Sequence, residues 1–420
     1  MLFLAMLVAG CVSVPPEEAT GPDERPVLGA FLPPAVAVRC ENCREPTVAA
    51  HPDGTLFAIV GTPNGMGVSS DGGATWKEAD APPLPPGIIP VLTRSDAILQ
   101  TDSQGRLYFT AMAWQASDGI GYVFHSGIQV ASSGDKGNTW DRNVLYSFPE
   151  GSGTAPLGAD RPWLTIAPDG TLYLSWLHYA GRVQTPSQGA PLITGVWVAR
   201  SDDGGLTFGS PVRATTTEGE GSGLSGQPVV DGQGQLVIPY GSYNYPQRVG
   251  RVTGEPLGLR LAVSADQGAT FESRLAIPEV AIFPSLAVQG DHWALAWWVG
   301  EGNARLRLSH DGGTTWSEDI NWTLGDRILH APWLLPAPDG WDVAWMSTND
   351  THETAHVTRI SFDGVVLHDG VAGLAPRPER YITTDFAHAV RMPDGRIATT
   401  WSDFDAAVAY VAVHARSAST

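Results

Sequence analysis

The chain has 420 residues, and its 25 Lys and Arg stand against 44 Asp and Glu, which gives a formal net charge of −19 at pH 7. This acidity excludes nucleic acid as an expected partner, because the phosphate backbone is bound by stripes of Lys and Arg that the sequence lacks. The 48 Gly, 33 Pro and 15 Trp favour an all-β protein with many turns and a core of large aromatic side chains.

The chain begins with an apolar run over residues 1–10. This run is too short to span a bilayer, so we predict a signal peptide. It ends Val-Ala-Gly-Cys, which resembles a bacterial lipoprotein cleavage box with Cys11 as the lipidated residue. An ordinary signal peptide with an incidental cysteine is the alternative.

Residues 11–26 are rich in Pro, Glu and Gly and are predicted to be a flexible tether. We therefore expect an exported protein, at the cell surface or in the periplasm, that meets the membrane only through its lipid.

Two further cysteines, Cys40 and Cys43, follow the tether. In an oxidising compartment a local disulfide between them is the simplest interpretation. A metal site or a redox pair is the alternative, but the sequence has no second cysteine pair to complete a set of four ligands. We expect a disulfide, with neither a metal nor another cofactor.

Residues 27–416 consist of repeats of one pattern. Each unit has a first strand that usually contains x-Pro, an Asp-Gly-like turn, a second strand that often ends in an aromatic residue, and a third strand. The third strand runs into a turn of the form Ser-x-Asp-x-Gly-x-Thr-aromatic. In such a turn the Asp carboxylate can accept backbone N–H bonds, Gly supplies a positive φ, and the aromatic ring lies back over apolar surface. Five copies begin at Ser69, Ser133, Ser201, Ser264 and Ser309, and a degenerate sixth begins at Ser361.

Alignment of the repeats gives seven units. Their first strands cover residues 45–48, 96–99, 161–164, 227–230, 283–286, 331–334 and 387–390. Seven antiparallel units of four strands predict a seven-bladed β-propeller, with six blades as the alternative. The seventh unit has only three clear strands, and the apolar segment 27–38 is predicted to supply its outer strand and close the ring. Ring closure leaves few exposed strand edges.

The Ser-x-Asp turns resemble the Asp boxes, or bacterial neuraminidase repeats, of the sialidase superfamily, over nearly all of residues 40–416. The resemblance implies a propeller with the boxes at the blade periphery, in a structural role. Sialidases of this kind have six blades, whereas we count seven units. The resemblance also implies a glycoside hydrolase that clamps a substrate carboxylate with three arginines and uses a Tyr nucleophile and an Asp acid.

One position of the sialidase site is matched by this sequence. Arg44, in Arg44-Glu45-Pro46, fits the Arg-x-Pro motif of the first arginine. The loop at residues 62–65, where the acid would lie, has no carboxylate, and Tyr240 and Trp297 stand where further arginines are expected. The catalytic residues are therefore left unassigned.

The repeat alignment also predicts a site. The first strand of a propeller blade is innermost, so residues at and just before the x of x-Pro converge on one mouth of the central channel. The aromatic residues that end the second strands are expected to surround this mouth: Trp176, Tyr240, Trp297, Trp345 and Trp401. Polar groups among aromatic rings suit a glycan or a peptide. The polar residues predicted to line the mouth are Arg44, Glu45, Arg94, Asp96, Asp160, Arg161, Gln227, His330, Asp385 and His388.

The same residues have plainer interpretations. The charges can pair across the channel and tie blades together, and the Trp side chains can pack blade against blade. His330 and His388 can bind a metal only with an acidic partner, and their spacing is a weak pattern for that. Two functions follow: a monomeric module that binds a glycan or a peptide, or a sialidase-type hydrolase with a rearranged catalytic set. An assembly factor acting through the flat propeller face is a third.

Overall fold

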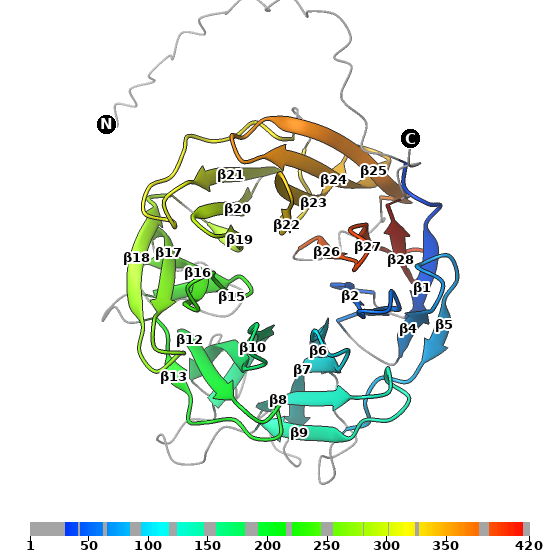
Figure 1. Cartoon of the computed structure of the whole chain (residues 1–420), viewed down its shortest axis with the longest axis horizontal. Coiled ribbons are helices and arrows are strands. Elements are labelled where there is room, and N and C mark those ends of the chain that lie inside the picture. Colours follow the sequence, from blue (N-terminus) through cyan, green and yellow to red (C-terminus); the bar gives the residue numbers. More distant parts are fainter. Residues whose placement is uncertain are drawn as a thin grey trace, which may run out of the picture.

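The computed structural model contains seven antiparallel sheets in a ring around a central channel (Figure 1). The predicted seven-bladed β-propeller is confirmed, and the alternative of six blades is wrong. Cys11, the tether and Asp385 lie outside the described residues. The structure describes residues 30–40, 43–61, 65–84, 94–116, 124–146, 157–180, 192–215, 221–244, 255–279, 281–300, 302–323, 327–377 and 386–414.

The strands of the first three blades follow one another from the axis outward. Blade 1 consists of β2 (Thr47–Ala50), β3 (Leu56–Ile59), β4 (Met66–Ser69) and β5 (Lys77–Ala79). Blade 2 consists of β6 (Arg94–Thr101), β7 (Leu107–Ala116), β8 (Phe124–Ser133) and β9 (Arg142–Tyr146). Blade 3 consists of β10 (Leu157–Ile166), β11 (Leu172–Ala180), β12 (Leu192–Ser201) and β13 (Val212–Arg213).

The remaining blades continue the ring. Blade 4 has β14 (Gly221–Ser225), β15 (Val229–Val230), β16 (Leu236–Tyr243), β17 (Pro256–Ser264) and β18 (Glu272–Ile277). Blade 5 has β19 (Ile282–Gln289), β20 (His292–Gly300) and β21 (Asn303–Ser309). Blade 6 has β22 (Trp333–Ala337), β23 (Gly340–Thr348), β24 (His352–Ser361) and β25 (Val366–Pro376). Blade 7 has β26 (His388–Arg391), β27 (Ile397–Asp403), β28 (Val408–Val413) and, outermost, β1 (Ala35–Arg39).

Two blades depart from four strands. In blade 4 the innermost strand is interrupted between β14 and β15, where a Cβ on Gly226 would lie 1.8 Å from the Pro284 carbonyl oxygen of blade 5. Among the described residues blade 5 has three strands, and the segment after β21 forms two backbone bonds with its outer edge. Ser317 N–H donates to Leu308 O (2.8 Å) and Ile320 N–H to Leu306 O (2.9 Å).

The ring is closed by the N-terminal strand, as predicted. β1 pairs antiparallel with β28, with Ala35 opposite Val411, and Phe31 forms an isolated bridge with His414. The last blade is therefore completed by the first strand of the chain. Within the described residues the fold contains no helix that could cross a membrane.

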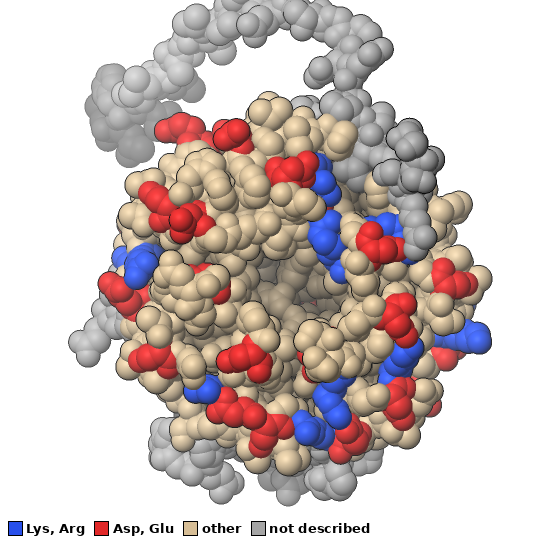
Figure 2. Space-filling model, viewed as in Figure 1, with Lys and Arg blue, Asp and Glu red and all other residues tan. Residues whose placement is uncertain are grey.

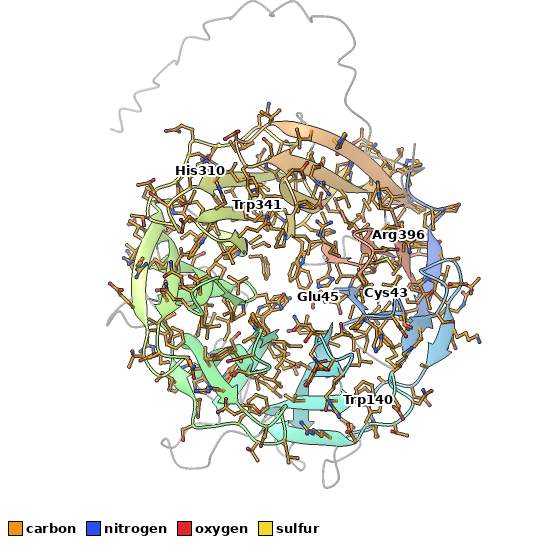
Figure 3. All side chains as sticks on the ribbon, viewed as in Figure 1. Cys43, Glu45, Trp140, His310, Trp341 and Arg396 are labelled. Atoms are coloured by element: carbon orange, nitrogen blue, oxygen red, sulfur yellow. A yellow bond between two sulfur atoms is a disulfide. The ribbon has the colours of Figure 1, made fainter. Side chains whose placement is uncertain are left out.

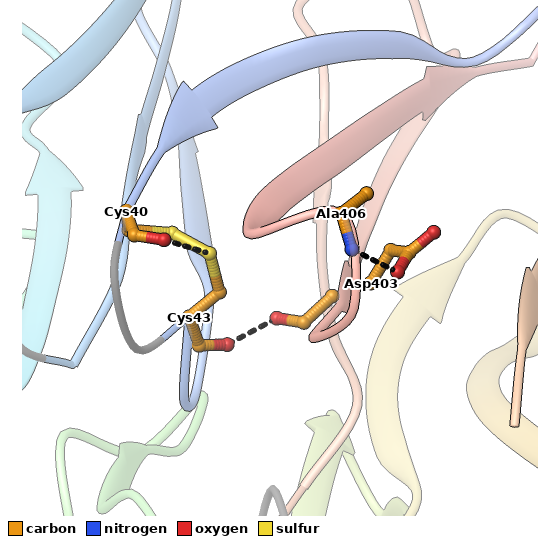
Figure 4. The surroundings of a disulfide bond; sticks show 5 residues. Cys40, Cys43, Asp403 and Ala406 are labelled. Carbon is orange, nitrogen blue, oxygen red and sulfur yellow. Dashed lines mark hydrogen bonds between the residues drawn. A yellow bond between two sulfur atoms is a disulfide. The ribbon is translucent and has the colours of Figure 1, made fainter. Parts of the chain in front are cut away.

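A disulfide joins Cys40 to Cys43 where the chain passes from the outer edge of blade 7 to the axis of blade 1 (Figure 4). Cys40 N–H donates to Ala407 O (3.0 Å), and the Ser402 hydroxyl donates to Cys43 O. Both bonds lead to blade 7. The closed loop is very short, so its contribution to stability is about 2 kcal/mol or less, and its main effect is to hold this passage against blade 7.

The Ser-x-Asp turns are held by bonds to their own carboxylates. In the turn that begins at Ser309, Asp311 Oδ1 accepts bonds from the Ser309 hydroxyl (2.8 Å) and from Thr315 N–H (2.8 Å), and Asp311 Oδ2 accepts one from the Thr315 hydroxyl (2.7 Å). The Ser309 hydroxyl accepts a bond from Gly313 N–H (2.9 Å). The same set of bonds occurs in the turns centred on Asp71, Asp135, Asp203 and Asp266.

These turns also join neighbouring blades. Gly73 has a φ of 94°, and a Cβ on it would lie 2.4 Å from Val413 Cγ2 of blade 7, so the turn of blade 1 fits against its neighbour only with glycine there. The aromatic residue that ends each turn is half-buried and packs on a core cluster. These residues are Trp76, Trp140, Phe208, Phe271 and Trp316.

We predict that the turns make folding stability depend on pH. The bonds from Thr315 and Ser309 lower the pKa of Asp311 from 3.8 to about 2. A carboxylate with a lower pKa in the folded chain stabilises the fold above its unfolded pKa, and this stability is lost as the pH falls. The free energy of unfolding should therefore decrease between about pH 4 and pH 2. The pKa is lowered to the same value, about 2, for Asp71, Asp203 and Asp266.

Two neighbouring threonines give a matched test. Thr315→Val removes a hydroxyl that bonds to the Asp311 carboxylate, whereas the Thr314 hydroxyl bonds to the Asp311 carbonyl oxygen (3.0 Å). Carboxyl NMR titration should show the pKa of Asp311 raised in Thr315→Val and nearly unchanged in Thr314→Val. Equal shifts in both variants would contradict this account of the turn.

Candidate functional site

The inner strands begin with an unusual backbone conformation in four blades. Glu45, Asp96, Arg161 and Phe283 have φ values of 51°, 54°, 54° and 48°, and they hold the position of x in blades 1, 2, 3 and 5. This left-handed region is disfavoured for residues with a Cβ and costs of order 1–3 kcal/mol per residue. Figure 3 places Glu45 close to the ring axis, whereas Trp140 and His310 lie farther out.

Three of these residues form a buried charge cluster. Arg161 Nη1 lies 2.8 Å from Glu45 Oε1, and the two side chains are only 12% and 9% exposed. The backbone N–H of Arg161 donates to Asp96 Oδ2 (3.3 Å). Burial raises the pKa of Asp96 well above its usual value; Arg161 opposes this shift, and the carboxylates of Glu45 and Asp160 add to it. The cluster therefore favours a protonated Asp96 beside a carboxylate that is paired with arginine.

Aromatic rings continue this cluster across the axis. The guanidinium carbon of Arg161 lies 5.0 Å from the centre of the Phe283 ring. The centre of the Trp163 ring in blade 3 lies 5.6 Å from the centre of the Trp333 ring in blade 6. It lies 5.4 Å from the centre of the Phe386 ring, just before blade 7. The space enclosed among the charged and aromatic groups is about 10 Å³, room for one water molecule. We call this set of residues the axial plug: Glu45, Asp96, Arg161, Trp163, Phe283, Trp333 and Phe386.

Beyond the plug the central channel has a volume of about 430 Å³. Its wall is formed by the inner strands of all seven blades and is mostly aliphatic, with Gln100, Gln227 and Ser285 among its polar residues. His388 also lines it. Burial lowers the pKa of His388 to about 3, so the ring is neutral and accepts a bond from Val48 N–H (3.3 Å). Gln227 Nε2 donates to Leu164 O of blade 3 (3.2 Å).

The other predicted site residues are spread over different environments. Arg44 is exposed, and its carbonyl oxygen accepts a bond from Gly61 N–H (2.6 Å). Arg94 is the first residue of β6, and Asp160 is half-buried beside Arg161. His330 is 2% exposed and lies just before β22. The structure thus brings Glu45, Asp96 and Arg161 together, leaves Arg44 at the surface and encloses His330.

The predicted ring of aromatic residues around the mouth is wrong. All five side chains are at most 1% exposed and pack in the core clusters within and between blades, because the second strand of each blade is covered on both faces: Trp176, Tyr240, Trp297, Trp345 and Trp401. The aromatic groups at the axis are instead Trp163, Trp333 and Phe386. A pattern for two of them was available, because Trp163 and Trp333 each follow an x-Pro dipeptide.

The charged side chains are distributed around the hollow of the ring. Figure 2 shows Lys, Arg, Asp and Glu mainly over the blades, with a largely uncharged surface around the central opening. Within the residues that the structure describes, no three His, Cys, Asp or Glu side chains are grouped to hold a metal ion. The axial plug differs from this surface because its ion pair, Glu45 with Arg161, is almost fully buried.

Comparison with known proteins gives a fold and no family. No family model matches the chain, and no curated protein matches it. An α-L-arabinanase from Penicillium chrysogenum, complexed with arabinobiose, is 16% identical over 91% of this chain and 98% of that chain, with a TM-score of 0.50. The Hadza microbial sialidase Hz136 is 17% identical over 86% and 74%, with a TM-score of 0.48. An intramolecular trans-sialidase from Ruminococcus gnavus is 14% identical over 88% and 94%, with a TM-score of 0.41. At these identities the likeness concerns the fold alone, a β-propeller.

We predict that removing the cation of the plug is costly. Arg161→Met leaves the Glu45 and Asp96 carboxyls buried without a positive partner, and it should lower the free energy of unfolding by about 3–5 kcal/mol. Denaturant unfolding measures this loss. In the double variant with Glu45→Gln, at least half of the stability should return, because the uncompensated charge is gone.

A surface pair provides the control. Arg274 pairs with Glu272 at 3.2 Å, but the side chains are 48% and 73% exposed. Arg274→Met should therefore change stability by less than about 1 kcal/mol. If Arg161→Met proved no more destabilising than Arg274→Met, the buried ion pair at the axis would be refuted.

Proposed function

We propose that this protein binds a glycan at the end of the propeller where the inner strands begin, over the axial plug. The observation that carries the proposal is the convergence of Glu45, Asp96 and Arg161 from three blades in left-handed backbone. Strain of this kind persists where the surrounding structure holds it, and it is frequent at binding and catalytic sites. The arabinanase neighbour was solved with a bound arabinobiose, which adds support for a carbohydrate ligand.

Arg44 is the residue we assign to the ligand. It is exposed, and it directly precedes Glu45, whose carboxylate already pairs with Arg161. An exposed guanidinium can bind a carboxylate or a sugar hydroxyl pair with two parallel bonds. Arg44 therefore supplies recognition at the surface, while the axial plug fixes the backbone that presents it.

A glycoside hydrolase is the second candidate, and one observation favours it. Such enzymes need one protonated and one ionised carboxyl group near the same bond. Asp96, whose pKa is raised, and Glu45, which pairs with Arg161, have these two states side by side. Under this candidate Asp96 is the general acid.

We also propose the cellular setting of this activity. The N-terminal run supports export, and Cys11 is the proposed lipid attachment site of a monomer held at the membrane by its tether. Labelled palmitate should be incorporated by the full chain in bacteria and not by Cys11→Ala; incorporation by both would refute attachment at Cys11.

A glycan array and a turnover assay separate the two candidates. Labelled full-length protein should bind a subset of arrayed glycans, and Arg44→Ala should weaken that binding about tenfold or more, the loss expected for one charged hydrogen-bonding group. Arg39→Ala is the control, because Arg39 is also exposed but lies on the outer strand of blade 7. Unchanged binding in Arg44→Ala would contradict the assigned site.

Turnover is measured on 4-methylumbelliferyl sialoside and arabinoside. Binding without release of the fluorophore supports the binding module. Release that disappears in Asp96→Asn, while glycan binding persists, establishes the hydrolase instead. Release that survives Asp96→Asn rules out Asp96 as the acid.

A further inference from the structure

A second polar cluster lies in blade 6, on one face of its three outer strands. Trp345 on β23 stands opposite His356 on β24, and Thr358 on β24 stands opposite Asp369 on β25. Residues two apart along a strand share a face, so Ser347 lies on the same side as Trp345, and His356 on the same side as Thr358. Register therefore brings Ser347, His356 and Asp369 together although they come from three strands.

In this cluster the His356 ring lies between the Ser347 hydroxyl and the Asp369 carboxylate. Ser347 Oγ lies 2.8 Å from His356 Nε2, and His356 Nδ1 lies 3.9 Å from Asp369 Oδ2. The other carboxylate oxygen, Asp369 Oδ1, accepts a bond from the Thr358 hydroxyl (2.6 Å). That hydroxyl in turn accepts a bond from Trp345 Nε1–H (2.8 Å). Hydrogen bonds from Trp345 to Thr358 and from Thr358 to Asp369 thus orient the Asp369 carboxylate.

Packing fixes the imidazole between its two partners. The His356 ring is stacked on Trp345 with ring centres 4.0 Å apart and planes 12° apart. The side chains of His356 and Asp369 are 6% and 7% exposed, whereas Ser347 is half-buried, one residue before the end of β23. A carboxylate that faces Nδ1 favours the tautomer with its proton on Nδ1. The Nε2 lone pair is then directed at the serine hydroxyl.

We infer that Ser347, His356 and Asp369 form a nucleophile, a general base and an orienting carboxylate for the hydrolysis of carboxylic esters. This site belongs to blade 6 and is independent of the glycan site proposed at the axis. The geometry gives the serine a base within hydrogen-bond reach, whereas the Asp369 carboxylate lies 3.9 Å from Nδ1, beyond hydrogen-bond distance, and acts on the ring through its charge. The partial exposure of Ser347 at the strand end suits a small acyl group.

The chemical steps balance without a cofactor. Ser347 Oγ attacks the ester carbonyl carbon while its proton passes to His356 Nε2, and the tetrahedral adduct then expels the alcohol, which takes that proton. Water attacks the acyl-serine in the same way, giving up a proton to His356. The acid is released and Ser347 regains its hydrogen. Asp369 keeps its charge throughout and stabilises the transient imidazolium.

The first test is labelling with a fluorophosphonate, which reacts with activated serines. We expect peptide mapping of the labelled full chain to find the adduct on Ser347. Ser317 is the control, because it is also half-buried and hydrogen-bonded but contacts Leu308 N–H and Glu318 O rather than a histidine. Failure of Ser347 to react, or reaction of Ser317 at the same rate, would overturn the proposal.

Variants show whether the whole cluster is needed. Ser347→Ala should abolish labelling at this position, and His356→Gln should slow it about 100-fold or more. Asp369→Asn keeps the shape of the side chain but favours the wrong tautomer, so it should also slow labelling about tenfold or more. Thermal unfolding checks that each variant is folded. A folded Asp369→Asn protein that labels as fast as the wild type would remove Asp369 from the site.

Hydrolysis of p-nitrophenyl acetate provides the second readout. The rate of the wild type should rise with pH as His356 loses its proton, because only the neutral ring can act as a base. This dependence should disappear in His356→Gln, and the enzymatic rate should disappear in Ser347→Ala. Equal rates for the wild type and Ser347→Ala would show that the cluster only stabilises the blade.

Discussion

The structure depends on the pairing of the first strand with the last. β1 completes blade 7 by joining β28, and this pairing brings blades 7 and 1 side by side although they are at opposite ends of the sequence. The bond from Val48 N–H to His388 Nδ1 across that boundary exists only in the closed ring. The disulfide at Cys40 and Cys43 holds the adjoining passage in place. Closure thus places the inner strands of blades 7 and 1 beside each other at the axis.

Closure of the ring also determines which charged side chains meet at the axis. Once the inner strands surround one axis, the residues at the start of each strand face their counterparts on the other blades. Arg161 then lies within reach of Glu45 and Asp96, and the burial that makes an isolated charge costly is offset by pairing. The turns at the opposite ends of the blades have a different role. Their carboxylates bond locally, and their glycines let neighbouring blades approach.

Repetition explains how much the sequence could predict. Because each unit repeats the same turn and the same x-Pro position, alignment alone identified seven blades, the closing segment and the meeting of Glu45, Asp96 and Arg161. The aromatic contacts at the axis were missed, although Trp163 and Trp333 each follow an x-Pro dipeptide, because the aromatic residues that end the second strands were assigned to the mouth instead. The cluster of Ser347, His356 and Asp369 was also missed. Its members are diagonal neighbours on three strands, and the spacing of residues along the chain does not reveal which residues of different strands become neighbours.

The most direct measurement of the closed ring is a crosslink between its two ends. Ala35 and Val411 are register partners across β1 and β28, whereas Ala409 stands opposite Val38. In the double variant Ala35→Cys with Val411→Cys, mild oxidation should join the new cysteines in nearly every molecule. The pair Ala35→Cys with Ala409→Cys, which is out of register, should remain largely unjoined. Equal crosslinking of both pairs, or none in the first, would contradict a propeller closed by its N-terminal strand.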